Sequence, residues 1–543
     1  NTPFDGFMLM LLGRDDAGRL ILMTNAFSDV PWKLSWFQSS IDDLKAAQSS
    51  RLTDNFIRLN SNPANVDWFD DAGWKEIINH WRIAAEVVKQ TGLKGIMLDT
   101  EHYTPGASQY DYAAQPQRDQ HTFEQYQEKA RQRGRELISA VAQVDPKMTL
   151  FTFFMLTEAT NIKAAQSTDP QAVLKLAATT NLPPANDPQA IIHRTGGYNL
   201  GSAFVNGWLD VAPSTMKFVE GCEPGYGYVD EIDYLRAANI IRHKCLRLIA
   251  PENRDKYKTQ MHMAMAFYLD AYANPSTSPW YIPPVNGLRI ERLKENLQYA
   301  GEVVDQYIWF WGEKHRWFST PNKPLANNSW EDAIPGVNQT LLAFALPERL
   351  VEMAEAQLDK AATKINLIQN GDFSAEGANT ASANKVTDWQ SKNAPQNWNS
   401  WQTTKSTGTI GLDKTVNHDG KSYSAKFVNV LEGSLIQQHA VQPGEMYLVR
   451  AWSRQQGAGS SLIRVDWQTA EKGWLDGQKQ GVTFMTEKST SADGWQQIQG
   501  VVTVPEGAAK LVVIVSTSNQ PTDGAIWFDD VQLYKIPKMD FSQ

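Results

Sequence analysis

Short runs of apolar residues alternate with longer amphipathic segments from the start of the chain to about residue 365. A run of four to eight apolar residues without alternation is typical of a strand buried on both faces, as in a parallel sheet. Apolar residues that recur every three or four positions, as from Trp74 to Trp81, predict helices that cover such a sheet. The pattern predicts seven strands: Phe4–Met10, Phe56–Asn60, Gly95–Asp99, Leu150–Leu156, Met216–Glu220, Met261–Tyr268 and Tyr307–Trp311.

Strands that alternate with helices over roughly 350 residues favour a parallel α/β sheet, and the (β/α)8 TIM-type barrel is the most common large form. A barrel needs an eighth strand, which we expect either at Leu20–Thr24 or upstream of Asn1. A doubly wound open sheet is the alternative, but no glycine-rich phosphate loop follows the first strand. The predicted helices are Gly73–Thr91, Phe123–Val144, Tyr228–Leu248 and Ile290–Gln306.

The pattern changes after a last predicted helix at Pro347–Lys364. From Asn366 onward, short stretches of alternating polar and apolar residues, such as KLVVIVSTS, are separated by Gly, Ser, Asn and Asp turns. This is typical of an all-β sandwich. We therefore expect two domains, an α/β barrel over residues 1–364 and a β-sandwich over residues 365–537, followed by a short tail.

Composition narrows the functional classes. A net charge of -9 without a concentrated basic run argues against a nucleic-acid surface. No run of about 18 apolar residues occurs, so we expect no membrane span. The chain begins at Asn1 without a Met, which favours either a secreted or periplasmic bacterial protein that has lost a signal peptide, or a trimmed chain. Cys222 and Cys245 could form a bridge, but two cysteines make no disulfide framework. The sequence leaves the oligomeric state open.

Aromatic residues make up 10% of the chain and include 19 Trp. Core packing explains part of this excess. The flat apolar face of a sugar ring also stacks on an indole, in the way that other flat apolar groups do. With the acidic strand end described next, the excess favours a carbohydrate ligand.

The segment KGIMLDTEHY is an apolar run that ends in Asp99 and Glu101, with His102 and Tyr103 beside them. Side chains two apart on a strand point the same way, so the two carboxylates share a face where the strand ends. Active sites of α/β barrels lie at the carboxyl ends of the strands. Two acids held together in a partly dry site have their pKa values pushed apart, and one can stay protonated as a general acid. The alternative is an Asp that caps a turn and a Glu that pairs with a helix.

Cleavage of a glycosidic bond also needs a carboxylate on the other side of the sugar ring. Glu220, at the end of the fifth predicted strand, is the candidate nucleophile, although it could simply pair with a Lys or Arg. No HxH, HExxH or Cys cluster occurs, so we expect no cofactor in catalysis. The expected substrate-binding residues stand at or near other strand ends and are Arg58, Asn60, Tyr103, Glu223, Tyr268, Trp309, Trp311 and Glu313.

The LDTEHY segment resembles the Asp-x-Glu strand ending of family 18 chitinases and related hexosaminidases, and the first domain resembles a barrel glycoside hydrolase. The resemblance implies that Glu101 is the acid/base and that Asp99 orients a substrate acetamido group, which attacks the anomeric carbon. It also implies that Tyr103 is a neighbour of the acid, and that Trp309 or Trp311 is a sugar platform.

The resemblance is partial, because Gly95 and Met97 stand where the family has further Asp residues. A retaining mechanism with Glu101 as acid/base and Glu220 as nucleophile is therefore the competing hypothesis.

The second domain resembles the jelly-roll carbohydrate-binding modules that accompany such enzymes, through its opening INLIQNGDFSAEG and its close AIWFDDVQLYKI. In that family the two ends meet on adjacent strands and commonly enclose a structural calcium. The resemblance implies Asp372 and Asp530 as calcium ligands, although Ser374 stands where many relatives have Glu. A glycan platform among its Trp residues, such as Trp389 or Trp474, is also implied.

These observations predict a glycoside hydrolase that cleaves a polysaccharide or oligosaccharide, with Glu101 as general acid/base assisted by Asp99. The alternative is a non-catalytic carbohydrate-binding or scaffold protein on a barrel fold. A polysaccharide lyase that uses Arg58 and Tyr268 is a third hypothesis. The sugar, the linkage and the stereochemical outcome stay open.

Overall fold

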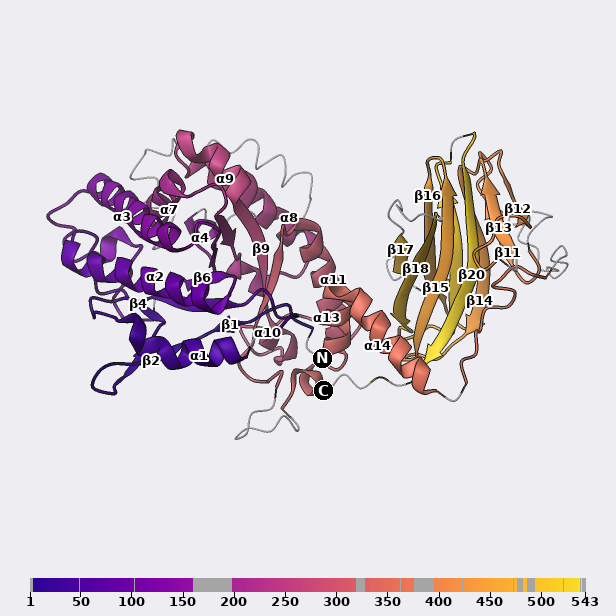
Figure 1. Ribbon diagram of the computed structural model, residues 1–543, viewed down its shortest axis with the longest axis horizontal. Helices are drawn as coiled ribbons and strands as arrows, with labels where there is room; N and C mark the ends of the chain where they lie inside the picture. Colours follow the sequence, from indigo (N-terminus) through magenta and orange to yellow (C-terminus); the bar gives the residue numbers. More distant parts are fainter. Residues whose placement is uncertain are drawn as a thin grey trace. The chain divides into compact units, whose positions relative to one another are not determined.

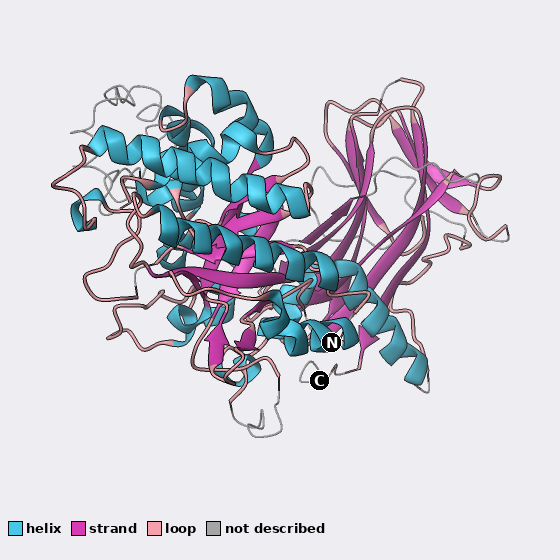
Figure 2. Cartoon of the chain, turned by 60° about the vertical axis from the view of Figure 1, so that its left-hand side comes forward, coloured by secondary structure: helices cyan, strands magenta, loops and turns pink. Residues whose placement is uncertain are grey.

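The computed structural model describes residues 3–47, 49–101, 103–159, 198–318, 328–361, 363–375, 395–420, 423–471, 473–475, 482–485, 494–520, 522–537 and 539. The chain forms two compact units, one from Thr2 to Val337 and one from Asn338 to Gln543. Helices surround the strands of the first unit, whereas strands make up most of the second (Figure 1, Figure 2). His102 and Trp389 lie outside the described residues.

The centre of the first unit is a parallel sheet in the order β1-β5-β6-β7-β8-β9-β10. Strand β4 also pairs with β5: β1 pairs with the start of β5, and β4 pairs with its end. Every pairing within it is parallel. The strands are β1 (Met8–Leu9), β4 (Asn25–Phe27), β5 (Phe56–Pro63), β6 (Gly95–Asp99), β7 (Thr149–Thr152), β8 (Lys217–Glu220), β9 (Met261–Tyr268) and β10 (Tyr307–Trp311).

The sheet is curled into a half-barrel, so side chains from distant strands meet inside it. The rings of Phe56 on β5, Phe151 on β7 and Tyr307 on β10 have centroids 5.7 to 5.8 Å apart. The parallel α/β architecture is thus confirmed. Among the described residues, β1 and β10 do not pair, so closure into a complete (β/α)8 barrel stays a prediction.

The suggested eighth strand at Leu20–Thr24 is wrong. Residues Leu20–Leu22 form β3, which pairs antiparallel with β2 (Leu12–Arg14) in a hairpin outside the parallel sheet. The cause is a tight turn, in which the Gly18 N–H donates to the Asp15 carbonyl and Gly18 adopts a φ of 79°. The chain therefore turns back on itself before it reaches the sheet.

Helices pack on the outer side of the half-barrel. Helix α2 starts at Asp70, whose carboxylate accepts hydrogen bonds from two N–H groups of the first turn, and ends at Gly92 in the left-handed conformation. Helix α3 starts with a capping box between Thr122 and Gln125. The helices of this unit are α1 (Gln38–Ala46), α2 (Asp71–Thr91), α3 (Phe123–Val144), α4 (Leu156–Ala159), α7 (Gly201–Val211), α8 (Glu231–Asn239), α9 (Arg254–Gln260), α10 (Leu269–Ala273), α11 (Arg289–Val303) and α12 (Trp330–Ala333).

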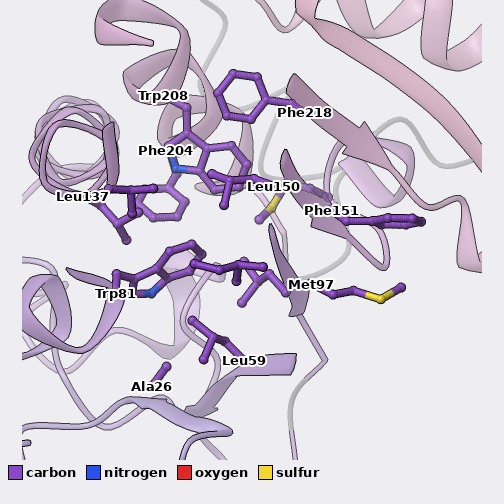
Figure 3. Packing of buried hydrophobic residues seen from close by; sticks show 14 of the residues in the cluster. Ala26, Leu59, Trp81, Met97, Leu137, Leu150, Phe151, Phe204, Trp208 and Phe218 are labelled. Carbon is purple, nitrogen blue, oxygen red and sulfur yellow. The ribbon is translucent and has the colours of Figure 1, made fainter. Parts of the chain in front are cut away.

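Side chains alternate between the two faces of the sheet. Figure 3 shows Leu150 on the side of the helix residues Phe204 and Trp208, whereas Met97 and Phe151 point to the opposite side. All five residues are at most 4% exposed, so both faces of the sheet are dry. This burial explains why the strand sequences read as continuous apolar runs.

The second unit contains two five-stranded antiparallel sheets, in the orders β11-β14-β19-β16-β17 and β12-β13-β20-β15-β18. The antiparallel β architecture predicted from alternation is confirmed. Its strands are β11 (Asn399–Gln402), β12 (Thr409–Asp413), β13 (Ser424–Val428), β14 (Glu432–Ala440), β15 (Met446–Gln456), β16 (Ser460–Gln468), β17 (Val482–Met485), β18 (Trp495–Thr503), β19 (Lys510–Ser518) and β20 (Ala525–Ile536).

Two helices precede these sheets, α13 (Val337–Ala345) and α14 (Pro347–Lys360). Leu350, Ala354 and Leu358 of α14 pack with Leu448 and Ile536 of the second sheet. The last predicted helix of the first domain therefore belongs to the compact unit that holds the β-sheets.

Both cysteines, Cys222 and Cys245, are buried and free, so the bridge that the sequence left open does not form. Among the described helices, none combines the length and the apolar composition needed to cross a bilayer.

Candidate active site

Polar side chains gather where β5 and β6 lie next to each other. The register pairs Asn60 with Asp99, and Arg58 lies two residues earlier on β5, opposite Met97. All three side chains point into the half-barrel, in phase with Phe56 and Met97. They are at most 7% exposed, so this is a charged group in a nearly dry interior.

Asp99 is the centre of this group and is fully buried. Its Oδ2 accepts hydrogen bonds from the Arg58 guanidinium, from Asn60 Nδ2 at 2.9 Å and from the Tyr103 hydroxyl at 2.9 Å. Its Oδ1 accepts the backbone N–H of Glu101 at 2.9 Å. Four donors compensate the burial of this carboxylate, which would otherwise be costly.

Glu101 lies one step further out and is partly exposed. Burial raises the pKa of its carboxyl, and the negative charge of Asp99 raises it further. A hydrogen bond from Tyr103 and the positive charge of Arg58 oppose the rise without cancelling it. Glu101 therefore holds its proton to a higher pH than an ordinary glutamate does.

Tyr103 connects the two acids, because oxygens of both Asp99 and Glu101 lie within hydrogen-bond distance of its hydroxyl and share its one proton. Burial and the two neighbouring carboxylates raise the pKa of Tyr103 well above its usual range, so it stays a donor. Its side chain is 51% exposed, which places it at the border between the dry interior and solvent.

Arg58 connects this group to the opposite side of the half-barrel. Its guanidinium lies over the ring of Phe153, at 5.3 Å, and over that of Trp311 on β10, at 5.2 Å. Trp311 in turn donates from Nε1 to Glu313 at 3.4 Å. The predicted residues Arg58, Trp311 and Glu313 are thus brought together.

Glu220 does not suit the role of nucleophile that the sequence predicted for it. It is 1% exposed, and its oxygens accept hydrogen bonds from the backbone N–H groups of Met155 and Leu156 and from the Thr157 hydroxyl at 2.9, 3.1 and 2.7 Å. On β8 it is in phase with Phe218, which stacks on Trp208 of helix α7. Glu220 therefore points out of the half-barrel and anchors the segment after β7.

Glu223 and Tyr226 follow β8 in a short 3-10 helix, Glu223–Gly227. The ring of Tyr226 lies 5.5 Å from Trp309 and 5.3 Å from Tyr268. Burial raises the pKa of Tyr226 well above its usual range, and the charges of Glu223, Glu101 and Asp99 add to this rise. The charges of Glu223, Glu101 and Asp99 therefore all reach the Tyr226 hydroxyl.

Glu313 is an exposed acid held in place by its surroundings. It accepts a hydrogen bond from the Tyr268 hydroxyl at 3.2 Å. Its backbone N–H donates at 2.7 Å to Asp270, which is fully buried and also accepts the N–H of Lys314. Asp270 thus fixes the chain just beyond β10.

The aromatic residues of the site have two different surroundings. Trp309 is 8% exposed, stacks on Phe153 at 4.7 Å and donates from Nε1 to the Gly221 carbonyl at 2.8 Å, so it mainly fills the interior. Trp280 is 50% exposed and lies edge-on to the rings of Tyr226 and Tyr268. Trp280 and the partly exposed Trp311 are the indoles that a sugar can reach.

Sequence reasoning missed Phe153, Tyr226 and Trp280. Phe153 lies inside the predicted strand Leu150–Leu156, and in the structure it follows β7 in phase with the inward-pointing Phe151. Tyr226 had a signal, since it stands three residues after Glu223 in a turn with a Pro and two Gly. Trp280 lies in an irregular stretch after β9, where no periodic pattern indicates a position.

In the described part of the chain, no group of three or more His, Cys, Asp or Glu side chains is placed so that it could hold a metal ion. The opening and closing segments of the β-unit do meet, because the Val531 N–H donates to the Gly371 carbonyl at 2.9 Å. Asp372 accepts from Ser374, however, and Asp530 pairs with His418 Nδ1 at 2.7 Å. The calcium site at Asp372 and Asp530 stays a prediction.

No protein-family model and no curated protein matches the chain. Among solved structures, part of it is similar to the enzymatically active domain of tailspike protein 4 of bacteriophage CBA120, at 17% identity and a TM-score of 0.22 over 32% of this chain and 22% of the phage chain. It is also similar to TmCBM61 in complex with β-1,4-galactotriose, at 16% identity and a TM-score of 0.22 over 32% of this chain and 99% of that one.

A third similar structure holds the CBM22-1 and GH10 modules of endo-1,4-β-D-xylanase 10B from Clostridium thermocellum, complexed with xylohexaose. Its identity is 11% and its TM-score 0.21, over 26% of each chain. This chain spans about a quarter of the length of the phage and xylanase structures that it matches. The structural neighbours thus include glycoside hydrolases and carbohydrate-binding modules, but likenesses of this extent assign no activity to the chain.

Proposed function

We propose that the chain is a glycoside hydrolase in which Glu101 is the general acid/base. The observation that carries the proposal is the position of Glu101, a partly exposed carboxyl that follows the fully buried Asp99 at the end of a parallel strand and accepts a hydrogen bond from Tyr103. Burial and the charge of Asp99 raise the pKa of this carboxyl. A general acid for an alkoxide leaving group has to hold a proton near neutral pH and yet be reachable by substrate. Glu101 is partly exposed, and its surroundings shift its pKa in the direction that a general acid requires.

In this proposal, Glu101 donates its proton to the glycosidic oxygen as the bond from that oxygen to the anomeric carbon breaks. Tyr103, which donates to Glu101, then stabilises the carboxylate that the transfer leaves behind. Glu101 takes a proton back when water enters. These steps require that the leaving oxygen lie within hydrogen-bond distance of Glu101.

Asp99 acts on Glu101 rather than on the sugar. Its two oxygens already accept four hydrogen bonds, and none of its surface is exposed. A role in orienting a substrate acetamido group would require that at least one of these bonds be exchanged. We therefore propose acid/base hydrolysis in which Asp99 raises the pKa of Glu101, without participation of an N-acetyl group.

The substrate in this proposal is a polysaccharide or oligosaccharide. The same hypothesis includes export of the protein, so that it acts on this substrate outside the cytoplasm. Trp280 and Trp311 offer flat faces for sugar rings, while Arg58, Glu313 and Glu223 offer hydrogen-bonding groups. The β-unit would act as an accessory carbohydrate-binding module, with the exposed Trp474 as one contact.

Hydrolysis across a panel of 4-nitrophenyl glycosides and of soluble polysaccharides tests the proposal, with the full-length wild type compared with Glu101→Gln. We expect at least one substrate to be cleaved, and the variant to lose activity about 10²- to 10⁴-fold on a polysaccharide, whose leaving oxygen needs a proton, at unchanged melting temperature. The loss should be smaller on a 4-nitrophenyl glycoside, because 4-nitrophenolate leaves without a proton. Activity on the polysaccharide that survives in Glu101→Gln would move the acid elsewhere. A wild type that binds a glycan and cleaves none would favour the carbohydrate-binding scaffold instead.

A further inference from the structure

We infer that Glu223 is the second catalytic carboxylate, which faces Glu101 across the sugar. This inference rests on the proposed function and deepens it. It replaces Glu220, whose carboxylate is turned to the outside of the half-barrel and is held there by backbone donors. The chain changes direction between Glu220 and Glu223, and this change turns Glu223 toward the inside of the half-barrel.

The segment after β8 is built for that change of direction. Gly221 has no room for a side chain, since an added Cβ would lie 2.4 Å from the Thr152 carbonyl oxygen. Cys222, a buried residue, adopts the left-handed conformation with a φ of 49°. Residues other than Gly in this conformation are strained and persist where the surroundings enforce them.

Neighbouring strands hold the segment on both sides. The Glu223 N–H donates to the Phe153 carbonyl at 3.1 Å, which ties it to the end of β7. On the other side, an added Cβ at Gly225 would lie 2.7 Å from Met265 Sδ and 2.8 Å from the Ala266 carbonyl of β9. The backbone on each side of Glu223 is therefore fixed by contacts that leave little freedom, as a catalytic side chain requires.

Tyr226 provides the connection between Glu223 and Glu101. A hydrogen bond to Glu223 and the charges of Glu223, Glu101 and Asp99 all act on its hydroxyl. Tyr226 is 8% exposed, and the rings of Trp309 and Tyr268 pack around it. The Tyr226 hydroxyl is thus within electrostatic reach of two carboxylates that follow different strands, Glu101 after β6 and Glu223 after β8.

Glu313 is the other acid that could take this role, but its surroundings suit substrate binding better. It is exposed, and Tyr268 and Trp311 donate to its two oxygens. Its position is set by Asp270 through the backbone. We expect Glu313 to contact a sugar hydroxyl and to affect KM more than kcat.

The reaction adds one water across the glycosidic bond. Glu101 gives its proton to the leaving oxygen while the electron pair of the breaking bond stays on that oxygen. On the other face of the ring, Glu223 supports the oxygen that attacks the anomeric carbon. That oxygen is its own carboxylate oxygen in the first of two displacements, or that of a water whose proton Glu223 takes.

The first test compares Glu223→Gln with Glu313→Gln on the 4-nitrophenyl glycoside that the wild type cleaves fastest. We expect Glu223→Gln to lose kcat about 10²- to 10⁴-fold and Glu313→Gln to change mainly KM. Added azide, a small anion that can attack the anomeric carbon, is expected to restore part of the activity of Glu223→Ala with formation of a glycosyl azide. A Glu223→Gln variant that keeps kcat would overturn the inference while the hydrolase proposal stands.

A second test does not require turnover. The carboxyl carbons of 13C-glutamate-labelled chain are titrated by NMR, and the Glu101 signal is assigned from its loss in Glu101→Gln. If Glu223 faces Glu101, removing the negative charge of Glu223 should lower the pKa of Glu101, and Glu313→Gln should lower it less. Equal shifts in both variants, or none, would overturn the pairing of Glu101 with Glu223. A shift in a protein that cleaves no glycoside would instead remove the hydrolase proposal and keep the pairing.

Discussion

Oδ1 of Asp99 accepts the backbone N–H of Glu101, two residues later, at 2.9 Å. This bond closes a tight turn at the end of β6, in the manner of an Asx turn, and sets where the Glu101 side chain starts. The same carboxylate supplies the negative charge that helps to raise the pKa of Glu101. One residue therefore provides both the geometry and part of the electrostatics of the proposed acid.

Replacing Asp99 by Asn should lower the pKa of Glu101, because the nearby negative charge is lost and the Arg58 charge is no longer compensated. The alkaline limb of kcat/KM, which reports deprotonation of the acid, should move to lower pH. The measurement is a pH–rate profile of both proteins between pH 4 and 9. An alkaline limb that stays in place would show that Asp99 does not tune the acid.

Replacing Tyr103 by Phe should have the opposite effect. The Tyr103 hydroxyl donates to Glu101 and so stabilises the charged form. Without it the pKa of Glu101 should rise, and the alkaline limb should move to higher pH in the same assay. Tyr112→Phe is the matched control, since its hydroxyl donates to the backbone carbonyls of Arg118 and His121 instead. A shift of the same sign in Asp99→Asn and Tyr103→Phe would contradict this assignment.

The sequence was sufficient to locate the strand that carries this site. Gly95–Asp99 begins and ends where the apolar run does, because a strand buried on both faces has a distinctive pattern. Asp99 and Glu101 could be placed on one face from their spacing alone. Their partner Arg58, 41 residues earlier, donates to Asp99 across two strands, a pairing that no local pattern reports. Its role as a substrate-binding residue stays a prediction.

The second acid was not predictable in the same way. Which of Glu220 and Glu223 faces inward depends on which residues of β8 point into the half-barrel. Phe218 and Val219 point to opposite faces and are both apolar, so the sequence does not indicate which face is inside. The left-handed residue Cys222 then changes the phase after the strand. Likewise, the curling of the sheet depends on contacts among β5, β7 and β10 that no local pattern reports.

The stability of the first unit should depend on pH through Asp210. Hydrogen bonds from Arg131, Asn253 and Arg135 overcome the effect of burial and lower the pKa of Asp210 to about 2. A lowered folded-state pKa contributes stability above the unfolded value, near 4, and this stability is lost as the pH falls to about 2. Asp210→Asn should therefore lower the free energy of unfolding by about 1 kcal/mol at pH 7. Thermal melts at pH 7 and pH 2.5 test this, since the two proteins should converge in acid. An equal difference at both pH values would exclude the electrostatic origin.

Helices α3 and α7 approach each other through two glycines. A Cβ at Gly207 would lie 2.0 Å from the Arg131 carbonyl oxygen, and one at Gly134 would lie 2.3 Å from that of Phe204. Because these neighbours are backbone atoms, they cannot move aside cheaply. Gly207→Ala should destabilise the unit by about 1 to 3 kcal/mol, the usual cost of overpacking. The control is Gly227→Ala, where nothing lies within 4 Å of the added Cβ. Equal denaturant midpoints for the two variants would contradict this interpretation.

Trp280 offers an exposed indole near the proposed site, at 50% exposure, and lies edge-on to Tyr226 and Tyr268. If a sugar ring stacks on Trp280, the indole stabilises the bound substrate and the transition state to the same extent, and Trp280→Ala should remove this stabilisation from both. KM should then rise about 2- to 10-fold with kcat nearly unchanged, the range expected for one aromatic contact. Trp474→Ala, which removes an indole of similar exposure from the other unit, should leave the kinetics on a short aryl glycoside unaltered. A fall in kcat with constant KM in Trp280→Ala would mean that the indole acts on the position of Tyr226, and through it on Glu223, rather than on the sugar.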